Sequence, residues 1–450
     1  MDYQALQKQY LDLAARVVEM AAGKGAIAEA YISAGENLSI EVRNQEVEAL
    51  TTARDQGLGL RVIAGQRVGF AFTTDFSPPA LELCVEQALA NARMATPDEH
   101  NCLPARYPGY PQLDLFDPEI TTTPVEKKIE LVREIERQAR AYDPRVKITE
   151  SCSYNDSRYL VVLVNSQGIT AAYHAAYCGA STFVVAVENE ESQTGFGLAY
   201  GLQYKNIDPA KIGREGAARA VRMLGARRVN TQRAAVVFDP YVATNFLGVI
   251  APALAADAVQ KGKSLFRGRV GQQVAAPVVN IIDDGRRPDG IASSPFDGEG
   301  VPTEHTVLVE KGVLKCYLHN TYTAARDGVK STGNGARGSF KTTPEVGTTN
   351  FYIEAGSHTP EEIIKEIPKG LYVTEVMGMH TANPISGDFS VGASGLWIEK
   401  GELTRPVRGV AIAGNIISLL EGIDAVGNDL TFFGATGAPT VRIASMTISG

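Results

Sequence analysis

The sequence predicts an α+β fold, in which two small antiparallel sheet-plus-helix units precede a β-rich C-terminal domain around one buried, Pro-kinked helix. Three observations predict this fold. The first half holds two series of alternating strand patterns, each followed by a proline-marked helix start, at Ser77-Pro78 and at Asp208-Pro209. An almost wholly apolar helix pattern begins at Asp239-Pro240. Beyond Arg233 the composition shifts toward Val, Gly and Thr, with many short strand patterns.

The first unit is expected to occupy residues 1–100. An amphipathic helix opens it and stops at Gly23, and its apolar stripe consists of Tyr3, Leu6, Tyr10, Leu13, Val17 and Met20. Alternating patterns predict strands at 28–33, 38–43, 45–54, 57–63 and 68–73. A second helix is predicted from Ser77-Pro78 through Met94, which places helices on one face of a sheet.

The second unit is expected at residues 124–228, after a proline-rich linker at 101–123 that lacks periodicity. Its first helix begins at a capping box around Thr123-Pro124 and runs to about Tyr142. Strand patterns follow at 146–154, 159–165, 169–178, 180–189 and 191–204, and Asp208-Pro209 begins a helix that ends at Gly225. Strand, turn, strand and capped helix recur in the order seen in the first unit, which suggests one unit used twice.

The C-terminal domain is expected at residues 229–450. After a short strand at 234–238, a helix is predicted from Asp239-Pro240 to about Gln260, ending at Gly262. Pro252 lies inside this pattern, where proline costs about 3 kcal/mol and kinks a helix. The clearer strand patterns lie at 278–283, 306–310, 313–318, 349–354, 370–376, 395–400 and 440–448, with peripheral helices at 360–366 and 415–425.

Several segments of the C-terminal half carry a family resemblance. They read KGKSLFRGRVGQQVAAPVVNIIDDG from Lys261, FDGEGVPTEHTVLVEKGVLK from Phe296, GNGARGSF from Gly333, GDFSVGASGLWIEKGELTRPVRGVAIAGN from Gly387 and APTVRIASMTISG at the end. In this order and spacing they resemble the TldD/TldE metallopeptidase family, also called PmbA or "modulator of DNA gyrase". The resemblance is dense over the C-terminal half and looser elsewhere.

The resemblance also predicts the branch of that family. In TldD-like members the apolar helix carries His-Glu-x-x-x-His, and a Cys near the C-terminus completes the zinc site. Counted back from Lys261-Gly262, these helix positions fall on Leu247, Gly248 and Pro252, and residues 430–450 contain no Cys. None of the three can ligate a metal. The chain therefore resembles the TldE/PmbA-like branch, with no catalytic residue and no metal of its own.

The resemblance implies a subunit of a zinc metallopeptidase that degrades unfolded peptides. Zinc is expected in a TldD-like partner, and the dimer is expected to form with that partner or with a second copy. Peptides are expected to bind in extended form, by strand addition to a sheet edge. Two alternatives stay open: a homodimeric peptide-binding or structural protein without proteolysis, and an autonomous hydrolase that uses residues such as Glu299 and His305.

Five residues are candidates for contact with a substrate. Asp297 and Glu299 lie two apart in a glycine-rich loop with His305 nearby, Arg337 lies within a second glycine-rich loop, and His380 lies in a further loop. The loop around Asp297 and Glu299 could line a peptide groove or contact a partner, and Arg337 could pair with a substrate carboxylate in a bidentate manner. The competing interpretation for each is structural, as a turn residue or an ion pair.

Composition excludes several classes of function. No two of the six histidines lie within five residues of one another, which excludes a two-His metal site on one helix. The net charge of −8 argues against nucleic-acid binding. Five scattered cysteines without a C-x-x-C pair fit a reducing cytoplasm. The apolar run 242–259 is interrupted by polar residues and by Pro252, so no membrane association is expected.

Overall fold

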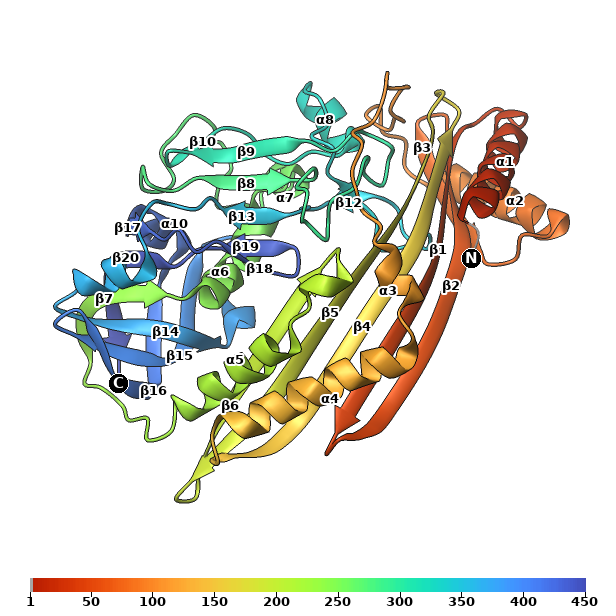
Figure 1. The fold of residues 1–450 in the computed structure, drawn as a ribbon. Helices are drawn as coiled ribbons and strands as arrows, with labels where there is room; N and C mark the ends of the chain where they lie inside the picture. Colours follow the sequence, from red (N-terminus) through yellow and green to blue (C-terminus); the bar gives the residue numbers. More distant parts are fainter. Residues whose placement is uncertain (1–2) are drawn as a thin grey trace.

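One long antiparallel sheet runs through both N-terminal units in the computed structural model, which describes residues 3–450 (Figure 1). Strand β1 of the first unit pairs with β4 of the second from Glu29–Asn165 to Val42–Cys152, so the two predicted units share one sheet. In spatial order the strands are β3 (Arg67–Thr73), β2 (Glu46–Ala64), β1 (Ile27–Arg43), β4 (Val146–Asn165), β5 (Thr170–Glu188) and β6 (Glu191–Gly201).

These strands are longer than the sequence predicts. The predicted strands 28–33 and 38–43 form one continuous strand, β1, and β2, β4 and β5 likewise each unite two predicted strands. The glycine and asparagine between the predicted pieces, Gly35 and Asn37, indicate a turn by composition. In the fold they pair with Asp55 and Ala53 on one side and with Tyr159 and Ser157 on the other, and pairing on both sides keeps them extended.

Four helices cover the same face of this sheet (Figure 1). Side chains alternate between the faces of a strand, so Ile32 and Ile40 of β1 point the same way. Ile32 packs under the first helix pair and Ile40 under α4. The helices are α1 (Tyr3–Ala22), α2 (Pro78–Met94), α4 (Val125–Tyr142) and α5 (Pro209–Val221), and the shorter α3 (Pro118–Thr122) and η1 (Tyr204–Asn206) lie in the connections.

Two further six-stranded sheets build the C-terminal domain. One contains β16 (Glu402–Asn415), β15 (Asp388–Glu399), β14 (Lys369–Met377), β7 (Gln232–Phe238), β20 (Val441–Ser449) and β17 (Ile423–Val426), and β16 also pairs with β20, which closes five strands into a ring. The other contains β10 (Val313–Leu314), β9 (His305–Glu310), β8 (Ile281–Asp284), β13 (Phe351–Ile353), β19 (Thr436–Ala438) and β18 (Thr431–Phe433).

Helix α6 (Pro240–Ala253) packs against both of these sheets, and its apolar side chains join one core cluster with theirs. Smaller elements surround this core: α7 (Ala256–Gln260), α8 (Thr321–Asp327), the pair β11 (Gly335–Ala336) and β12 (Glu345–Val346), α9 (Pro360–Lys365), η2 (Met379–Thr381) and α10 (Ile416–Glu421). No helix within residues 3–450 is both long and apolar enough to cross a membrane.

The predicted single helix to Gln260 is divided into α6 and α7, so the predicted length is wrong. Pro252 lies in the last turn of α6, and Ala255 is already extended, with ψ of 130°. The break is stabilised by backbone pairing to a distant segment, because Leu318 N donates to Leu254 O and Ala256 N donates to Leu318 O. The predicted helix at 415–425 is also shorter, since Ile423 pairs with β20 instead.

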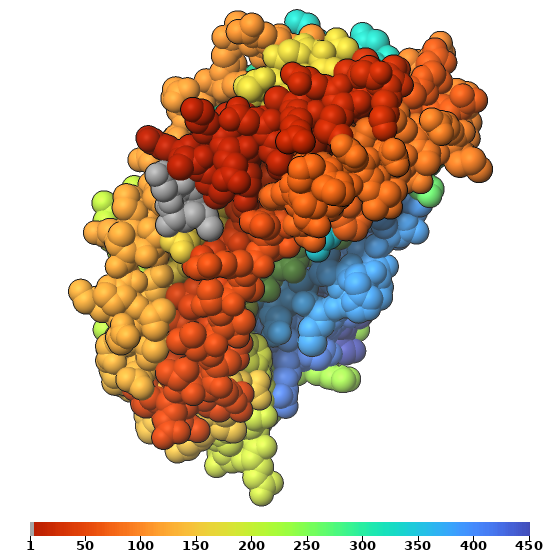
Figure 2. Space-filling view, turned by 90° about the vertical axis from the view of Figure 1, so that its right-hand side faces the viewer, coloured from red at the N-terminus to blue at the C-terminus, as the bar shows by residue number. Residues whose placement is uncertain are grey.

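Half of strand β2 is accessible along a free edge. Every residue from Glu46 to Gln56 is exposed, and β3 pairs with β2 only from Leu58 onward. Figure 2 shows this orange-red strand along the outer edge of the sheet, with the blue C-terminal domain set back beside it. In the described part of the chain, residues 46–56 therefore form a free sheet edge, whose outer backbone groups could pair with an added strand.

We predict that Gly197→Ala destabilises the sheet–helix contact between β6 and α5. A Cβ atom at Gly197 would lie 2.0 Å from the carbonyl oxygen of Ile212, so the helix must move away. The expected loss in the free energy of unfolding is about 1–3 kcal/mol, measured by urea denaturation. Gly201→Ala at the end of the same strand is the control, because its nearest neighbour would lie 3.9 Å away. Equal losses in the two variants would contradict the prediction.

Candidate functional site

Helix α6 presents one accessible stripe at the positions where the family resemblance predicts a degenerate metal motif. The helix begins because Asp239 accepts a hydrogen bond from Val242 N at 2.8 Å and Pro240 occupies the first turn. Gly248 and Pro252 are exposed, and they share a face with Tyr241 and Asn245 at spacings of three and four residues. We call these four residues the α6 stripe.

The three motif positions do not fit a metal. Leu247 is fully buried in the C-terminal core, so its side chain points away from the α6 stripe. Gly248 has no side chain and faces open space, while the Pro252 ring carries no ligand atom. Among residues 3–450, no three His, Cys, Asp or Glu side chains are grouped so that they could hold a metal ion.

Three of the predicted substrate-contact residues, Asp297, Glu299 and Arg337, converge at the junction between the long sheet and the C-terminal domain. Glu299 is fully buried, and its two oxygens accept from Arg61 Nη1 at 3.0 Å and Thr321 N at 2.7 Å. Arg61 Nη2 donates to Glu29 at 3.0 Å, and Arg337 also pairs with Glu29. We call Glu29, Arg61, Glu299 and Arg337 the junction network.

The glycine-rich loop at 333–338 supplies three of the contacts at this junction. Asn334 Nδ2 donates to Asp283 Oδ2 at 2.7 Å, Gly335 N donates to Asp297 Oδ2 at 2.7 Å, and Arg337 Nε donates to Gly298 O at 2.6 Å. Glycine is needed at 335, because a Cβ atom there would lie 2.9 Å from the Asp297 carboxylate. The loop therefore holds the 297–299 segment in place through its bonds to Asp297 and Gly298.

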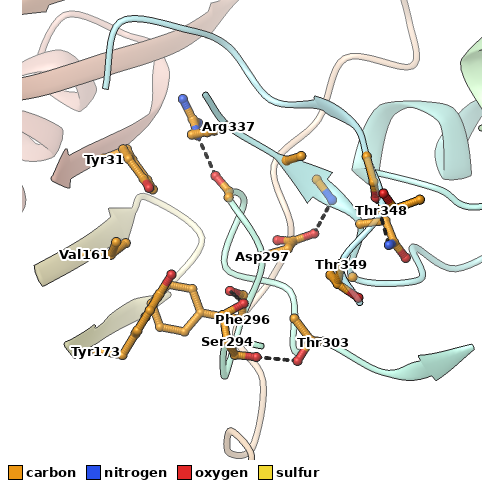
Figure 3. A pocket seen from close by; sticks show the side chains of 16 residues that line it. Tyr31, Val161, Tyr173, Ser294, Phe296, Asp297, Thr303, Arg337, Thr348 and Thr349 are labelled. Atoms are coloured by element: carbon orange, nitrogen blue, oxygen red, sulfur yellow. Dashed lines mark hydrogen bonds between the residues drawn. The ribbon is translucent and has the colours of Figure 1, made fainter. Parts of the chain in front are cut away.

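A cavity of about 170 Å³ lies beside the junction network (Figure 3). Its sheet wall is formed by Tyr31, Val161 and Tyr173, and its opposite wall comes from loops of the C-terminal domain that include Asp297 and Arg337. The guanidinium of Arg337 also lies 4.9 Å from the Tyr31 ring centre, a cation–π distance. The cavity is small and polar on one side, so it suits water or a small polar group.

Burial sets the electrostatics of Asp297. Removal from water, followed by the neighbouring charge of Glu299, raises the pKa of Asp297. Three backbone donors, Glu299 N, Val301 N and Gly335 N, oppose this shift by bonding the ionised form. Both Asp297 oxygens are thereby bonded by backbone donors, one oxygen by its own loop and the other by the 333–338 loop, which favours a structural role for this carboxylate.

Comparison with known proteins identifies the family. Family models described as PmbA/TldA metallopeptidase domain 1, central domain and C-terminal domain match residues 28–92, 118–224 and 231–450. The chain is also 31% identical over 451 residues to Metalloprotease PmbA of Escherichia coli O157:H7, which covers 99% of this chain and 97% of that protein. The chain belongs to the PmbA/TldD metallopeptidase family.

The chain is also similar to other proteins of the PmbA/TldD family, in sequence and in fold. A Metalloprotease TldD homolog of Haemophilus influenzae is 30% identical over 393 residues, covering 83% of this chain and 79% of that protein. A crystal structure of a candidate modulator of a DNA gyrase from Thermotoga maritima superposes with a TM-score of 0.91 at 27% identity, covering 98% of this chain and all of that one. TldE from Thermococcus kodakarensis, at 23% identity, matches in fold with a TM-score of 0.91 over 97% of this chain and all of that one. The predicted family and α+β fold class are confirmed.

The two histidines predicted to contact substrate lie outside the junction. His305 Nδ1 lies 3.1 Å from Asp284 Oδ2 and is half-exposed, and His380 is exposed in η2. Because both Glu299 oxygens are engaged and His305 contacts Asp284, the geometry of this pair lends no support to the autonomous hydrolase alternative.

Sequence reasoning missed Glu29, Arg61, Tyr31 and Tyr173, although a signal for the first two was present. Glu29 and Arg61 are each a single charge inside an apolar strand pattern. In the fold they lie directly opposite each other on β1 and β2. An isolated charge in a buried strand indicates a buried partner.

We predict that Arg61→Met lowers the free energy of unfolding by about 3–5 kcal/mol, because it leaves Glu29 and Glu299 buried without their shared cation. Urea denaturation measures the loss. The matched control is Arg54→Met on the same strand, whose pair with Glu36 at 2.8 Å is exposed on the arginine side. The control should lose about 1 kcal/mol or less. A comparable loss in both variants would contradict the role of the junction network.

We predict that the stability of the protein depends on pH through Asp239. Burial raises the pKa of this carboxyl to about 6, although the nearby Arg219 cation opposes the shift. A raised folded-state pKa gives stability that is complete below pH 4 and lost as the pH rises through about 6. Asp239→Asn keeps the helix cap but has no charge to bury. Its stability relative to the native protein should therefore rise between pH 4 and 7, by up to about 3 kcal/mol for two pKa units.

Urea denaturation at pH 4, 5, 6 and 7 tests this effect. Asp208→Asn, which changes the exposed cap of α5, is the control for replacing a capping carboxylate. A stability difference between Asp239→Asn and the native protein that stays constant across this range would refute the assignment.

Proposed function

We propose that this chain is the TldE/PmbA-like, non-catalytic subunit of a cytoplasmic zinc metallopeptidase that degrades unfolded peptides. The observation that carries the proposal is the α6 stripe. At the motif positions the helix offers Gly248 and Pro252 to solvent and turns Leu247 into the core. A zinc site needs three or four nitrogen, oxygen or sulfur ligands, and this helix face supplies none at those positions.

The partner in this proposal is a TldD-like subunit that carries the zinc. Support comes from the similarity of this chain to a Metalloprotease TldD homolog, which covers 83% of this chain. Related chains have similar surfaces, so a surface through which one chain pairs with its own copy can also pair with the other chain. A second copy of this chain is the alternative partner. Such a homodimer would bring together two α6 stripes without ligands, so it would bind peptides without cleaving them.

Peptide substrates in this proposal bind in extended form at a sheet edge. Residues 46–56 of β2 are exposed, and among residues 3–450 the backbone groups on their outer side have no strand partner. An added strand would gain main-chain hydrogen bonds without depending on side-chain sequence, which suits varied unfolded peptides. The polar groups of Asp297, Glu299 and Arg337 are already engaged within the protein, so in this proposal they hold the domains together instead.

Zinc content and peptidase activity test the proposal, on the purified chain alone and mixed with a TldD-like partner. We expect the chain alone to be free of stoichiometric zinc and inactive, and the mixture to cleave unfolded peptides. A TldD-like subunit assayed alone at the same concentration is the control. Stoichiometric zinc or cleavage in the lone chain would overturn the non-catalytic role, and an inactive mixture would leave the homodimeric peptide-binding alternative.

A further inference from the structure

Two arginines, Arg219 and Arg222, line a groove between α5 and the C-terminal domain. The groove measures about 330 Å³, and we define it by Leu198, Arg219, Arg222, Pro240, Phe432 and Phe433. A smaller cavity of about 40 Å³ adjoins it, and the same two arginines line that cavity with Thr374 and Glu375. The arginine groove thus combines three cations, Arg219, Arg222 and Lys211, with the single carboxylate of Glu215 and with apolar and aromatic walls.

Arg219 is held in place by the protein. It lies in the last turn of α5, with its guanidinium 4.4 Å from the centre of the Phe196 ring and 5.8 Å from that of Tyr241. Its Nη1 also lies 3.7 Å from Asp239 Oδ2. These contacts orient one cation at the groove wall.

Arg222 has no such partner. Its Nε is shielded from solvent without a hydrogen bond, and within residues 3–450 its side chain has no ion pair. Three acids lie nearby without forming an ion pair with Arg222: Glu215 lies 3.8 Å from Lys211, Asp239 caps α6, and Glu375 lines the smaller cavity. Burial, followed by the charge of Arg219, lowers the pKa of Arg222, and the charge of Asp239 opposes this shift only in part. An unmatched buried donor is costly, and a carboxylate is the group that satisfies an arginine fork in a bidentate manner.

We propose that the arginine groove binds the C-terminal carboxylate of a peptide, with Arg222 as the anchor and Leu198, Phe432 and Phe433 around an apolar last side chain. This inference rests on the proposed function in taking its ligand to be a peptide. Inorganic anions share the charge but have nothing to place against the aromatic wall.

The α6 stripe continues from this groove. Tyr241, the first residue of the stripe, packs against Phe196 at 4.5 Å and Phe433 at 5.2 Å between ring centres. Gly248 lies seven residues further along α6, a rise of about 10 Å. That distance equals about three residues of extended peptide. A peptide that leaves the groove beside Tyr241 would therefore need about three extended residues to reach Gly248.

Isothermal titration calorimetry on the purified chain alone tests the carboxylate site. The probe is the peptide Ala-Ala-Ala-Phe with a free C-terminus, compared with its C-terminal amide and with inorganic phosphate. We expect the amide to bind at least about tenfold more weakly, since a hydrogen-bonded charge pair is lost. Arg222→Gln should show the same loss and no longer distinguish acid from amide. Arg214→Gln is the control, because Arg214 lies on the same helix and bonds Gln138 outside the groove.

Equal affinity for the acid and the amide would overturn the proposal, and so would full affinity in a folded Arg222→Gln variant. Displacement of the peptide by an equal concentration of phosphate would also overturn it, because the site would then be a general anion site. Should Arg222→Gln fail to fold, the comparison of acid and amide on the native chain still decides. This assay needs no partner and no zinc, so its failure is distinguishable from the absence of peptidase activity in the mixture.

Discussion

The buried junction network is the interaction on which the arrangement of this protein depends. Arg61 on the long sheet is shared between Glu29, opposite it on the same sheet, and Glu299 in a C-terminal loop. Such a network is costly to desolvate and is stabilising only when every charge is matched. Arg337 provides the second cation for Glu29, so two guanidinium groups face two carboxylates across the domain boundary. The network therefore specifies how the domains meet more than it adds to stability.

This constraint accounts for the conspicuous glycine-rich loops. Backbone donors of the 297–301 and 333–338 segments approach Asp297 closely because Gly335 has no Cβ, and the arginine that follows reaches back to the sheet. Asp297, Glu299 and Arg337, which resemble a substrate site by composition, thus form contacts between the C-terminal loops and the long sheet. Polar side chains in glycine-rich loops are typical of both roles, and only their partners distinguish them.

Helix α6 has two contrasting faces. Its apolar residues join the core between the two C-terminal sheets, while Tyr241, Asn245, Gly248 and Pro252 stay accessible. Its break after Ala253 depends on backbone bonds to Leu318, more than 60 residues away. The helix thus links the core, the α6 stripe and the arginine groove, and this is the face along which we propose that a peptide lies.

The type and order of most elements could be predicted from local sequence signals, because caps, prolines and apolar periodicity act over a few residues. Residue chemistry alone also shows that Leu247, Gly248 and Pro252 cannot ligate a metal. Long-range contacts, in contrast, were needed to show that the strands of two units merge into one sheet, that α6 ends at Ala253, and that Arg61 meets Glu299. Periodicity reports which way a side chain faces but not which distant group it meets, and Arg61 and Glu299 are 238 residues apart. The unpartnered state of Arg222 emerged in the same way, since it depends on every neighbour that the fold brings near.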